Sequence, residues 1–305
     1  MKELSRYRVN EWVALKPFIH RFRALRNKLL LFFYMRKKTN GCAEVIEKLR
    51  HSDEFIVVTI AFEQVEVIDW LAFFFNKNVD DGILLVADNS RDHAKASKIK
   101  EICLSYQVSY VRLPSNGTRH VNRSHSMAME WVYRKLIKIL DPDFFGFIDH
   151  DLIPVAQVGL KKKIQHQDFY GLLRPGGENH EDPDAWSLWA GYCFFNNAKL
   201  RKRGFNFMYD FSRGLDTGGG NYEKIYRNYS RDAIQFCPVY GNVLSVPELG
   251  QVREVQQIDE EWYHIGSVSY NNNIKNKIDA VKCIRNALEQ GLTWDDLVLE
   301  KMRSW

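Results

Sequence analysis

Two aspartates separated by one residue, Asp149 and Asp151, directly follow an apolar stretch at 144–148. Such a stretch predicts a buried strand, and Pro154 marks its end. Because alternate side chains of an extended chain lie on one face, the two carboxylates can converge if the extended pattern continues. Carboxylate oxygens suit Mg²⁺ or Mn²⁺, so the pair could hold a divalent cation that carries a diphosphate. An ordinary Asp-containing turn is the alternative.

Asp149-His150-Asp151 after an apolar strand resembles the DxD motif of nucleotide-sugar glycosyltransferases with the GT-A fold. The resemblance covers residues 54 to 270, approximately. It implies a transferase in which this motif, His150 included, holds Mn²⁺ or Mg²⁺ and the diphosphate of a nucleotide-diphosphate-sugar donor. The acceptor that it implies is a glycan or a lipid-linked molecule.

A third ligand for the cation is expected late in the chain. His264-Ile265-Gly266 resembles the His-x-Gly with which several metal-dependent GT-A families supply a histidine. Imidazole is an acceptable ligand for Mn²⁺ beside two carboxylates. A structural or surface histidine is the alternative.

The ends of the first two predicted strands are expected to hold the nucleoside. Residues 55–61 and 83–87 are apolar and rich in β-branched side chains, which is typical of buried parallel strands. The resemblance implies that Asp88 contacts the base or ribose, from which a carboxylate accepts a hydrogen bond. Thr59 and Ala61 would line the same pocket. A turn without a ligand is the alternative for Asp88.

A polar, basic segment follows the third predicted strand, 108–113. Its Asn-Gly pair suits a turn with positive φ, and the helix that starts next attracts anions at its N-terminus. By resemblance, Asn116, Arg119 and Asn122 lie near the nucleotide or its diphosphate. A solvated loop and helix cap is the alternative.

The apolar segment 186–195 resembles the GT-A strand that passes beneath the donor sugar, where Gly191 would permit close approach. Trp186 and Trp189 could form a platform for a sugar ring or belong to the core. Asp216 lies in a Gly-rich loop and is the candidate acceptor-binding residue or general base. An inverting transfer needs a carboxylate that takes the proton of the acceptor hydroxyl; a helix-capping Asp is the alternative.

Strands and helices alternate four times up to residue 148, which predicts an α/β fold of the GT-A, Rossmann-like type. We expect a mostly parallel central sheet flanked by helices, with a basic helical extension at the N-terminus. The expected divisions are a basic amphipathic segment at 1–50, a catalytic domain at 51–270 and a helical tail at 271–305. The tail is predicted to hold helices at 278–290 and 293–302.

The net charge of +5 is unevenly distributed. Residues 1–40 hold eleven Lys and Arg against Glu3 and Glu11, so the remainder is mildly acidic. This distribution argues against a nucleic-acid groove across the body. Basic residues interleaved with Trp and Phe predict an amphipathic helix on an anionic membrane surface. A helix that packs on the body, or on the second subunit of a homodimer, is the alternative.

The five cysteines are scattered, which is typical of a reducing compartment, and there is neither a secretory signal nor an apolar run long enough for a bilayer. We therefore expect a cytoplasmic protein, peripheral on the inner membrane face if the leader binds lipid.

Three other functions stay open. A sugar-1-phosphate nucleotidyltransferase has a similar architecture, but its Gly-rich first loop is absent at 61–64. A non-catalytic sugar-nucleotide-binding or scaffold protein of the same fold is favoured if Asp149, Asp151 and His264 do not converge. A metal-dependent phosphohydrolase has the least support, because one Asp-x-Asp lacks further His/Asp clusters.

Overall fold

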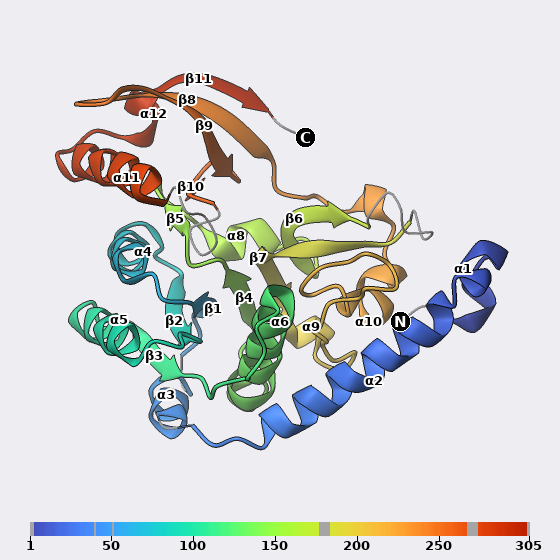
Figure 1. Ribbon diagram of the computed structural model, residues 1–305. Coiled ribbons are helices and arrows are strands. Elements are labelled where there is room, and N and C mark those ends of the chain that lie inside the picture. Colours follow the sequence, from blue (N-terminus) through green and yellow to red (C-terminus); the bar gives the residue numbers. More distant parts are fainter. Residues whose placement is uncertain (1–2, 40, 51, 177–183, 267–273, 304–305) are drawn as a thin grey trace.

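The structure is a computed structural model that describes residues 3–39, 41–50, 52–176, 184–266 and 274–303 (Figure 1). A six-stranded sheet in the order β3-β2-β1-β4-β7-β6 lies at its centre. Neighbours among the first four strands are parallel, and β7 is antiparallel to both β4 and β6. These strands are β1 (Phe55–Ala61), β2 (Gly82–Asp88), β3 (Ser109–Arg112), β4 (Phe144–Ile148), β6 (Phe169–Pro175) and β7 (Trp186–Asn196). The predicted fold class, a mostly parallel sheet flanked by helices, is confirmed.

Helices cover both faces of this sheet (Figure 1). The core on one face contains α4 (Val65–Asn78) and α5 (His93–Ser105), and the core on the other contains α6 (Val121–Val132). Alternate side chains of β1 enter the two cores, because successive residues of a strand point to opposite faces. The helix predicted after the third strand continues beyond α6 through a π-helical turn, Tyr133–Ile137, into α7 (Lys138–Leu140). Shorter helices are α8 (Leu160–Ile164), α9 (Asn197–Leu200) and α10 (Asn221–Lys224).

A second sheet, in the order β11-β8-β9-β10-β5, was not predicted. Its strands are β5 (Leu152–Pro154), β8 (Val239–Val246), β9 (Gly250–Ile258), β10 (Trp262–His264) and β11 (Val298–Arg303). The predicted helix at 278–290 is present as α11 (Ile274–Glu289). The predicted helix at 293–302 is wrong beyond α12 (Trp294–Leu297), because the following residues pair with β8 as an edge strand.

The N-terminal segment forms α1 (Val9–Val13), α2 (Lys16–Met35) and α3 (Cys42–Leu49). Leu31 and Tyr34 of α2 belong to the same core cluster as Val58 of the central sheet. The leader therefore packs on the body along one face. No helix among the described residues is both long enough and apolar enough to cross a membrane.

Candidate functional site

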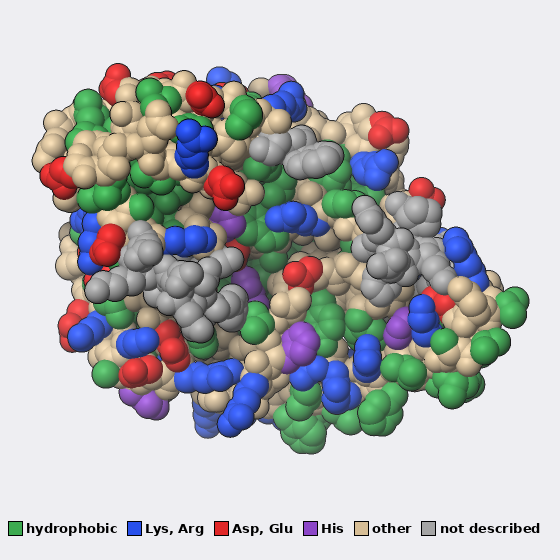
Figure 2. Space-filling model, turned by 45° about the horizontal axis from the view of Figure 1, so that its top comes forward, with side chains coloured by type: hydrophobic (Ala, Val, Ile, Leu, Met, Phe, Trp, Pro, Cys, Tyr) green, Lys and Arg blue, Asp and Glu red, His purple; other side chains and the backbone are tan. Residues whose placement is uncertain are grey.

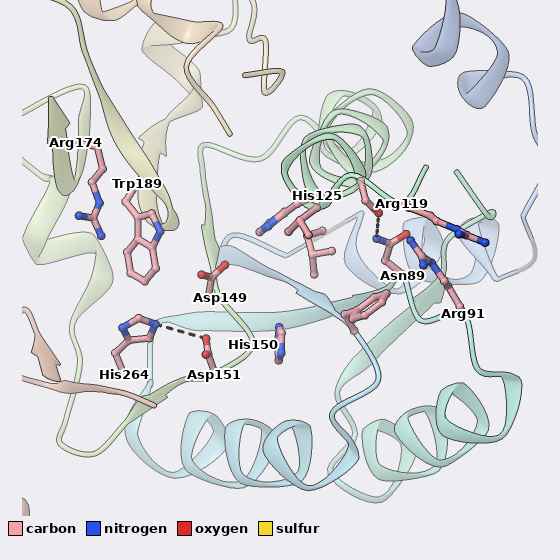
Figure 3. A pocket seen from close by; sticks show the side chains of 14 residues that line it. Asn89, Arg91, Arg119, His125, Asp149, His150, Asp151, Arg174, Trp189 and His264 are labelled. Atoms are coloured by element: carbon pink, nitrogen blue, oxygen red, sulfur yellow. Dashed lines mark hydrogen bonds and ion pairs between the residues drawn. The ribbon is translucent and has the colours of Figure 1, made fainter. Parts of the chain in front are cut away.

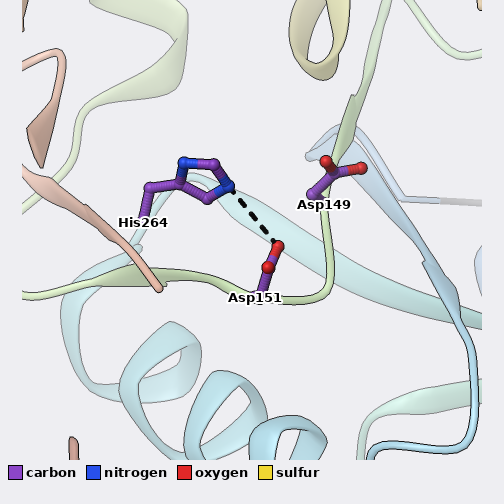
Figure 4. Close-up of side chains that lie close together, drawn as sticks. All are labelled: Asp149, Asp151 and His264. Carbon is purple, nitrogen blue, oxygen red and sulfur yellow. Dashed lines mark ion pairs between the residues drawn. The ribbon is translucent and has the colours of Figure 1, made fainter. Parts of the chain in front are cut away.

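Asp149, Asp151 and His264 converge at the point where the two sheets meet (Figure 4). Asp149 follows β4, and its backbone N–H donates to the carbonyl of Gly191 in β7 at 2.9 Å. Asp151 precedes β5, which pairs antiparallel with β10 and sets Leu152 opposite His264. Backbone pairing across more than a hundred residues of sequence thus delivers the histidine to the two carboxylates. One ligand atom from each residue lies within 4.8 Å of the others.

The His264 ring is held by the neighbouring strand. Its Nδ1 forms a hydrogen bond with Oε1 of Gln256, the residue opposite it in β9. With Nδ1 as the donor, the lone pair of Nε2 faces Oδ1 of Asp151 at 3.7 Å. Two electron-pair donors then face each other, which a cation satisfies better than either side chain does. Gln256 is the kind of outer partner that orients a metal-binding histidine.

Burial sets the protonation of the cluster. It raises the pKa of Asp149 to about 8, with smaller contributions from the carboxylates of Asp151 and Asp216. Burial also lowers the pKa of His264, although Asp151 opposes this shift. A neutral imidazole and carboxyl groups that repel one another without a counter-charge are suited to a divalent cation.

The position of the Asp149 side chain requires a glycine at residue 191. A Cβ on Gly191 would lie 2.5 Å from Oδ2 of Asp149 and 2.4 Å from the ring of Trp189. The resemblance implies that a ligand approaches Gly191. In the structure, the groups that approach it are the Asp149 carboxylate and the Trp189 ring. Gly191 also lines a cavity beside the cluster.

A cavity of about 560 Å³ lies over the cluster (Figure 3). Figure 3 shows the acidic groups and His264 at one end and Arg91 and Arg119 at the other. Arg174 and Trp189 lie beside the acidic end, with the guanidinium 5.6 Å from the ring centre. The lining residues are Ile60, Phe62, Asn89, Arg91, Arg119, Val121, Ser124, His125, Asp149, His150, Asp151, Arg174, Trp189 and His264. Predicted residues His150 and Arg119 thus lie in the same cavity as the metal cluster.

The start of α6 contributes Val121, Ser124 and His125 to the cavity lining. Asn116 donates from Nδ2 to Oγ of Ser124 at 2.8 Å and to Oδ1 of Asn89 at 3.2 Å. It therefore braces two residues of the cavity wall, while its own side chain lines a neighbouring cavity. Arg91 donates to the carbonyl of Thr118 at 2.8 Å, which fixes one of the two guanidinium groups at this end.

The structure does not bring Thr59 and Ala61 to the cavity. Both are fully buried within the sheet layer, and Ile60 and Phe62 line the cavity instead. The side chains of β1 that point toward the cavity are therefore shifted by one residue from those that were predicted to line the nucleotide pocket. The Thr59 hydroxyl has no hydrogen-bond partner within the described part of the chain.

Asp88 is also absent from the cavity lining. Its carboxylate is fully buried and ion-paired with Arg112 of β3 at 2.9 Å. The Tyr110 hydroxyl donates to it at 2.8 Å, and the backbone N–H of Ser90 donates to its other oxygen at 2.8 Å. The parallel pairing of β2 with β3 sets Arg112 opposite Asp88. The Asp88 carboxylate is thus engaged by these three partners. Asn89 and Arg91, which follow it in the sequence, line the cavity.

Asp216 lies in an adjoining cavity of about 440 Å³. Asp149 and Arg174 line both cavities, so Asp216 is across a shared wall from the cluster. Its side chain is exposed, and one carboxylate oxygen accepts from the N–H of Thr217 at 2.7 Å. Predicted residue Asn122 lines the same cavity, and its carbonyl accepts from the Thr217 hydroxyl at 3.4 Å.

Sequence reasoning missed His125 and Arg174, and it left two tryptophans undecided. Trp186 is core, whereas Trp189 lines both cavities and meets the His264 ring edge-to-face at 5.0 Å. Burial lowers the pKa of His125 to about 4, with His150 adding to the shift. Arg174 is the penultimate residue of β6 and opens a sequence segment, 174–184, that is rich in Gly, Pro and acidic residues, a position that could have identified it as a binding residue.

No protein-family model and no curated protein matches the chain. It resembles solved structures of GT-A glycosyltransferases. With S. aureus TarS it shares 15% identity at a TM-score of 0.36, over 56% of this chain and 34% of that one. With the mannosyltransferase PcManGT from Pyrobaculum calidifontis, solved with GDP-Man and Mn²⁺, the identity is 11% and the TM-score 0.43, over 93% and 76% of the two chains.

With glucosyl-3-phosphoglycerate synthase from Mycobacterium tuberculosis, solved with Mn²⁺, UDP and glucosyl-3-phosphoglycerate, the identity is 14% and the TM-score 0.31, over 54% of this chain and 64% of that one. The chain spans about a third of the length of TarS.

Proposed function

We propose that this chain is a glycosyltransferase that moves a sugar from a nucleotide-diphosphate donor to a glycan or lipid-linked acceptor, with Mn²⁺ or Mg²⁺ as its cation. The convergence of Asp149, Asp151 and His264 beside a cavity with arginines at its far end carries the proposal. This layout offers oxygen and nitrogen ligands at one end and anion-binding donors at the other.

Different residues of the cavity would contact different parts of the donor. Asn89, Arg91 and Arg119 face the nucleotide portion, where guanidinium groups and an amide supply hydrogen bonds. Arg174 brings positive charge to the acidic end, where the leaving diphosphate gains charge during transfer. The half-buried Trp189, which lines both cavities, offers an aromatic surface for the sugar.

Asp149, Asp151 and His264 would hold the cation, and the facing lone pairs of His264 and Asp151 fit one. When bound, a divalent cation neutralises charge on the departing diphosphate. The chain itself would orient the donor, with Asp149 and Asp151 lining the cavity beside the cation.

Asp216 is the proposed acceptor of the proton from the attacking hydroxyl. Its carboxylate is exposed in the adjoining cavity, which shares Asp149, Arg174 and Trp189 with the donor cavity. An acceptor in that cavity would therefore lie next to the donor sugar. The backbone N–H of Thr217 holds one carboxylate oxygen, which leaves the other for the hydroxyl.

Calorimetry with UDP and GDP in the presence of Mn²⁺ tests the donor site. Asp151→Asn keeps the shape of the side chain, and we expect it to weaken Mn²⁺-dependent binding by at least about a hundredfold, because even outer-shell changes cost about 10- to 100-fold. Asp143→Asn is the matched control, since Asp143 is exposed at the other end of β4. Unchanged binding by Asp151→Asn would refute the cation assignment.

A transfer assay separates the proton acceptor from the donor site. Asp216→Asn should retain UDP or GDP binding. The rate at which the enzyme forms free nucleoside diphosphate from the donor during transfer should fall by about 10²- to 10⁴-fold. Full activity in this variant would remove Asp216 from the chemistry without affecting the cation assignment.

The alternatives are less well supported by the same residues. The connection between β1 and α4 is only residues 62–64, with no glycine, which disfavours a nucleotidyltransferase. Separation of the three ligands would favour a non-catalytic role, and one ligand atom from each lies within 4.8 Å of the others. A phosphohydrolase needs further metal ligands, and the described residues offer one such cluster.

A further inference from the structure

α2 exposes a row of large apolar side chains on the side that faces away from the body. Helical geometry, at about 100° per residue, gathers six apolar residues into one stripe along the helix, and their exposed fractions run from 48% to 70%. This outer stripe consists of Phe18, Phe22, Leu25, Leu29, Phe32 and Phe33. The opposite, buried face carries Leu31 and Tyr34 of the core together with the polar His20 and Asn27. A helix that packs on a soluble body usually exposes a polar face, so the apolar outer stripe calls for a covering partner.

Basic residues border the outer stripe on both sides. Helical spacing places Arg21 and Lys28 along one margin and Arg26 along the other. All three are exposed, and among the described residues none is paired with a carboxylate. Glu11, one of two acidic residues in 1–40, is buried. The surface is therefore apolar along its centre and positive at its margins.

We propose that the outer stripe of α2 docks on an anionic lipid surface, with the helix lying in the plane of the membrane. The apolar side chains would enter the boundary between head groups and acyl chains. The basic side chains would reach the phosphates while their stems lie on apolar surface. The inference depends on this helix alone and not on the proposed transfer reaction. It narrows the expectation for residues 1–40 to one face of one helix.

A second copy of the chain fits this surface less well. Two outer stripes packed together would set the Arg and Lys margins of one copy beside those of the other. The helix carries no acidic residue between Lys16 and Met35 that could offset them, and like charges across an interface are unfavourable. Anionic head groups supply the negative charge that a second copy lacks.

The inner face of α2 connects the docking helix to the site. Asn27 donates from Nδ2 to the Tyr209 hydroxyl at 3.0 Å and accepts from Nε of Arg123 at 3.2 Å. Arg123 belongs to α6, whose first residues line the donor cavity. Figure 2 shows hydrophobic and basic side chains together along the lower right edge of the molecule, over α1 and α2. Docking there would hold the catalytic body beside the lipid surface, where a lipid-linked acceptor is found.

Vesicle sedimentation of the full chain tests the proposal, with vesicles of phosphatidylglycerol and phosphatidylcholine in equal parts and of phosphatidylcholine alone. We expect binding to the anionic vesicles at low salt that falls steeply as salt is added. The triple variant Phe22→Ser/Leu25→Ser/Leu29→Ser should bind about a hundredfold more weakly, because three large side chains leave the lipid boundary.

A control triple with closely similar exposure lies elsewhere on the surface. Leu104, Ile139 and Leu299 are 65%, 55% and 53% exposed, against 70%, 56% and 50% for Phe22, Leu25 and Leu29. Leu104→Ser/Ile139→Ser/Leu299→Ser should bind vesicles as the wild type does. Both triples should bind UDP or GDP with Mn²⁺ unchanged, so a failed donor site would not be mistaken for failed docking.

Three results would overturn the proposal. They are a wild-type protein that ignores anionic vesicles at low salt, a stripe variant that binds them normally, and a wild-type dimer that the stripe variant dissociates. If the stripe variant does not fold, Arg21→Glu/Lys28→Glu replaces it, because this change leaves the apolar surface intact. It should weaken binding to anionic vesicles, and normal binding by this variant would equally refute the proposal.

Discussion

Replacing Asp149 by Asn should stabilise the cation-free protein while removing a ligand of the cation. Burial and the nearby carboxylates raise the pKa of Asp149 to about 8. Between about pH 4 and pH 8 the folded chain therefore holds a proton at Asp149 that the unfolded chain releases. The free energy of unfolding of the wild type falls with rising pH across that window because of this group. The amide of Asp149→Asn does not titrate, so the variant lacks this loss.

The size of the effect follows from the width of the window. Each pH unit of the window contributes about 1.4 kcal/mol, so a window from about pH 4 to about pH 8 sets an upper limit near 6 kcal/mol. Asp149 is partly exposed to the cavity, and solvent screening reduces the value. We expect the variant to gain about 2 kcal/mol at pH 8, which is about 3 °C in Tm for a chain of this size.

Thermal unfolding in a chelating buffer at several pH values between 5 and 9 measures the difference. The gap between Asp149→Asn and the wild type should widen up to about pH 8 and then stay constant. Asp143→Asn, an exposed change at the other end of β4, should show no such pH-dependent gap. Adding Mn²⁺ should raise the Tm of the wild type more than that of Asp149→Asn. A gap that does not depend on pH, or a destabilised variant at pH 8, would refute the reasoning.

Two further substitutions test the residues that the structure keeps out of the cavity. Thr59→Val removes a buried hydroxyl that lacks a partner among the described residues, so donor affinity should be unchanged in calorimetry and Tm unchanged or higher; a clear loss of affinity would return Thr59 to the pocket. Arg112→Met leaves the Asp88 carboxylate buried without its cation and should lower the free energy of unfolding in urea by about 3 kcal/mol. Arg201→Met breaks an exposed pair with Asp141 and should change it by less than about 1 kcal/mol.

The sequence predicts the central sheet well because each parallel strand is a short, continuous apolar run that is visible without its neighbours. The strand before Asp149 and the strand 55–61 are found within a residue of their predicted bounds. The second sheet escapes prediction because its long strands are partly exposed, so no continuous apolar run marks β9. The final strand, β11, is almost entirely exposed, and it forms by pairing with β8.

In the candidate site, too, local features could be predicted from the sequence and features that depend on strand pairing could not. The spacing of Asp149 and Asp151 is local, so the sequence predicts it, and a motif resemblance suffices to suggest His264. What places His264 is the pairing of β10 with β5, which depends on the register of two strands distant in sequence. The exchange of Thr59 for Ile60 in the cavity wall depends on register in the same way.

The three proposed ligands lie where the two sheets meet, and their electrostatics oppose that arrangement when no cation is bound. Asp149 and Asp151 repel each other in a buried place, and this repulsion contributes to the raised pKa of Asp149. His264 enters that place neutral, because burial lowers its pKa, and Gln256 fixes its ring with a lone pair toward Asp151. Without a cation this arrangement opposes folding, and β5 and β10 nevertheless build it. A site organised for binding a cation is expected to lower the stability of the cation-free protein. The Asp149→Asn variant should recover the stability that is lost at this cluster.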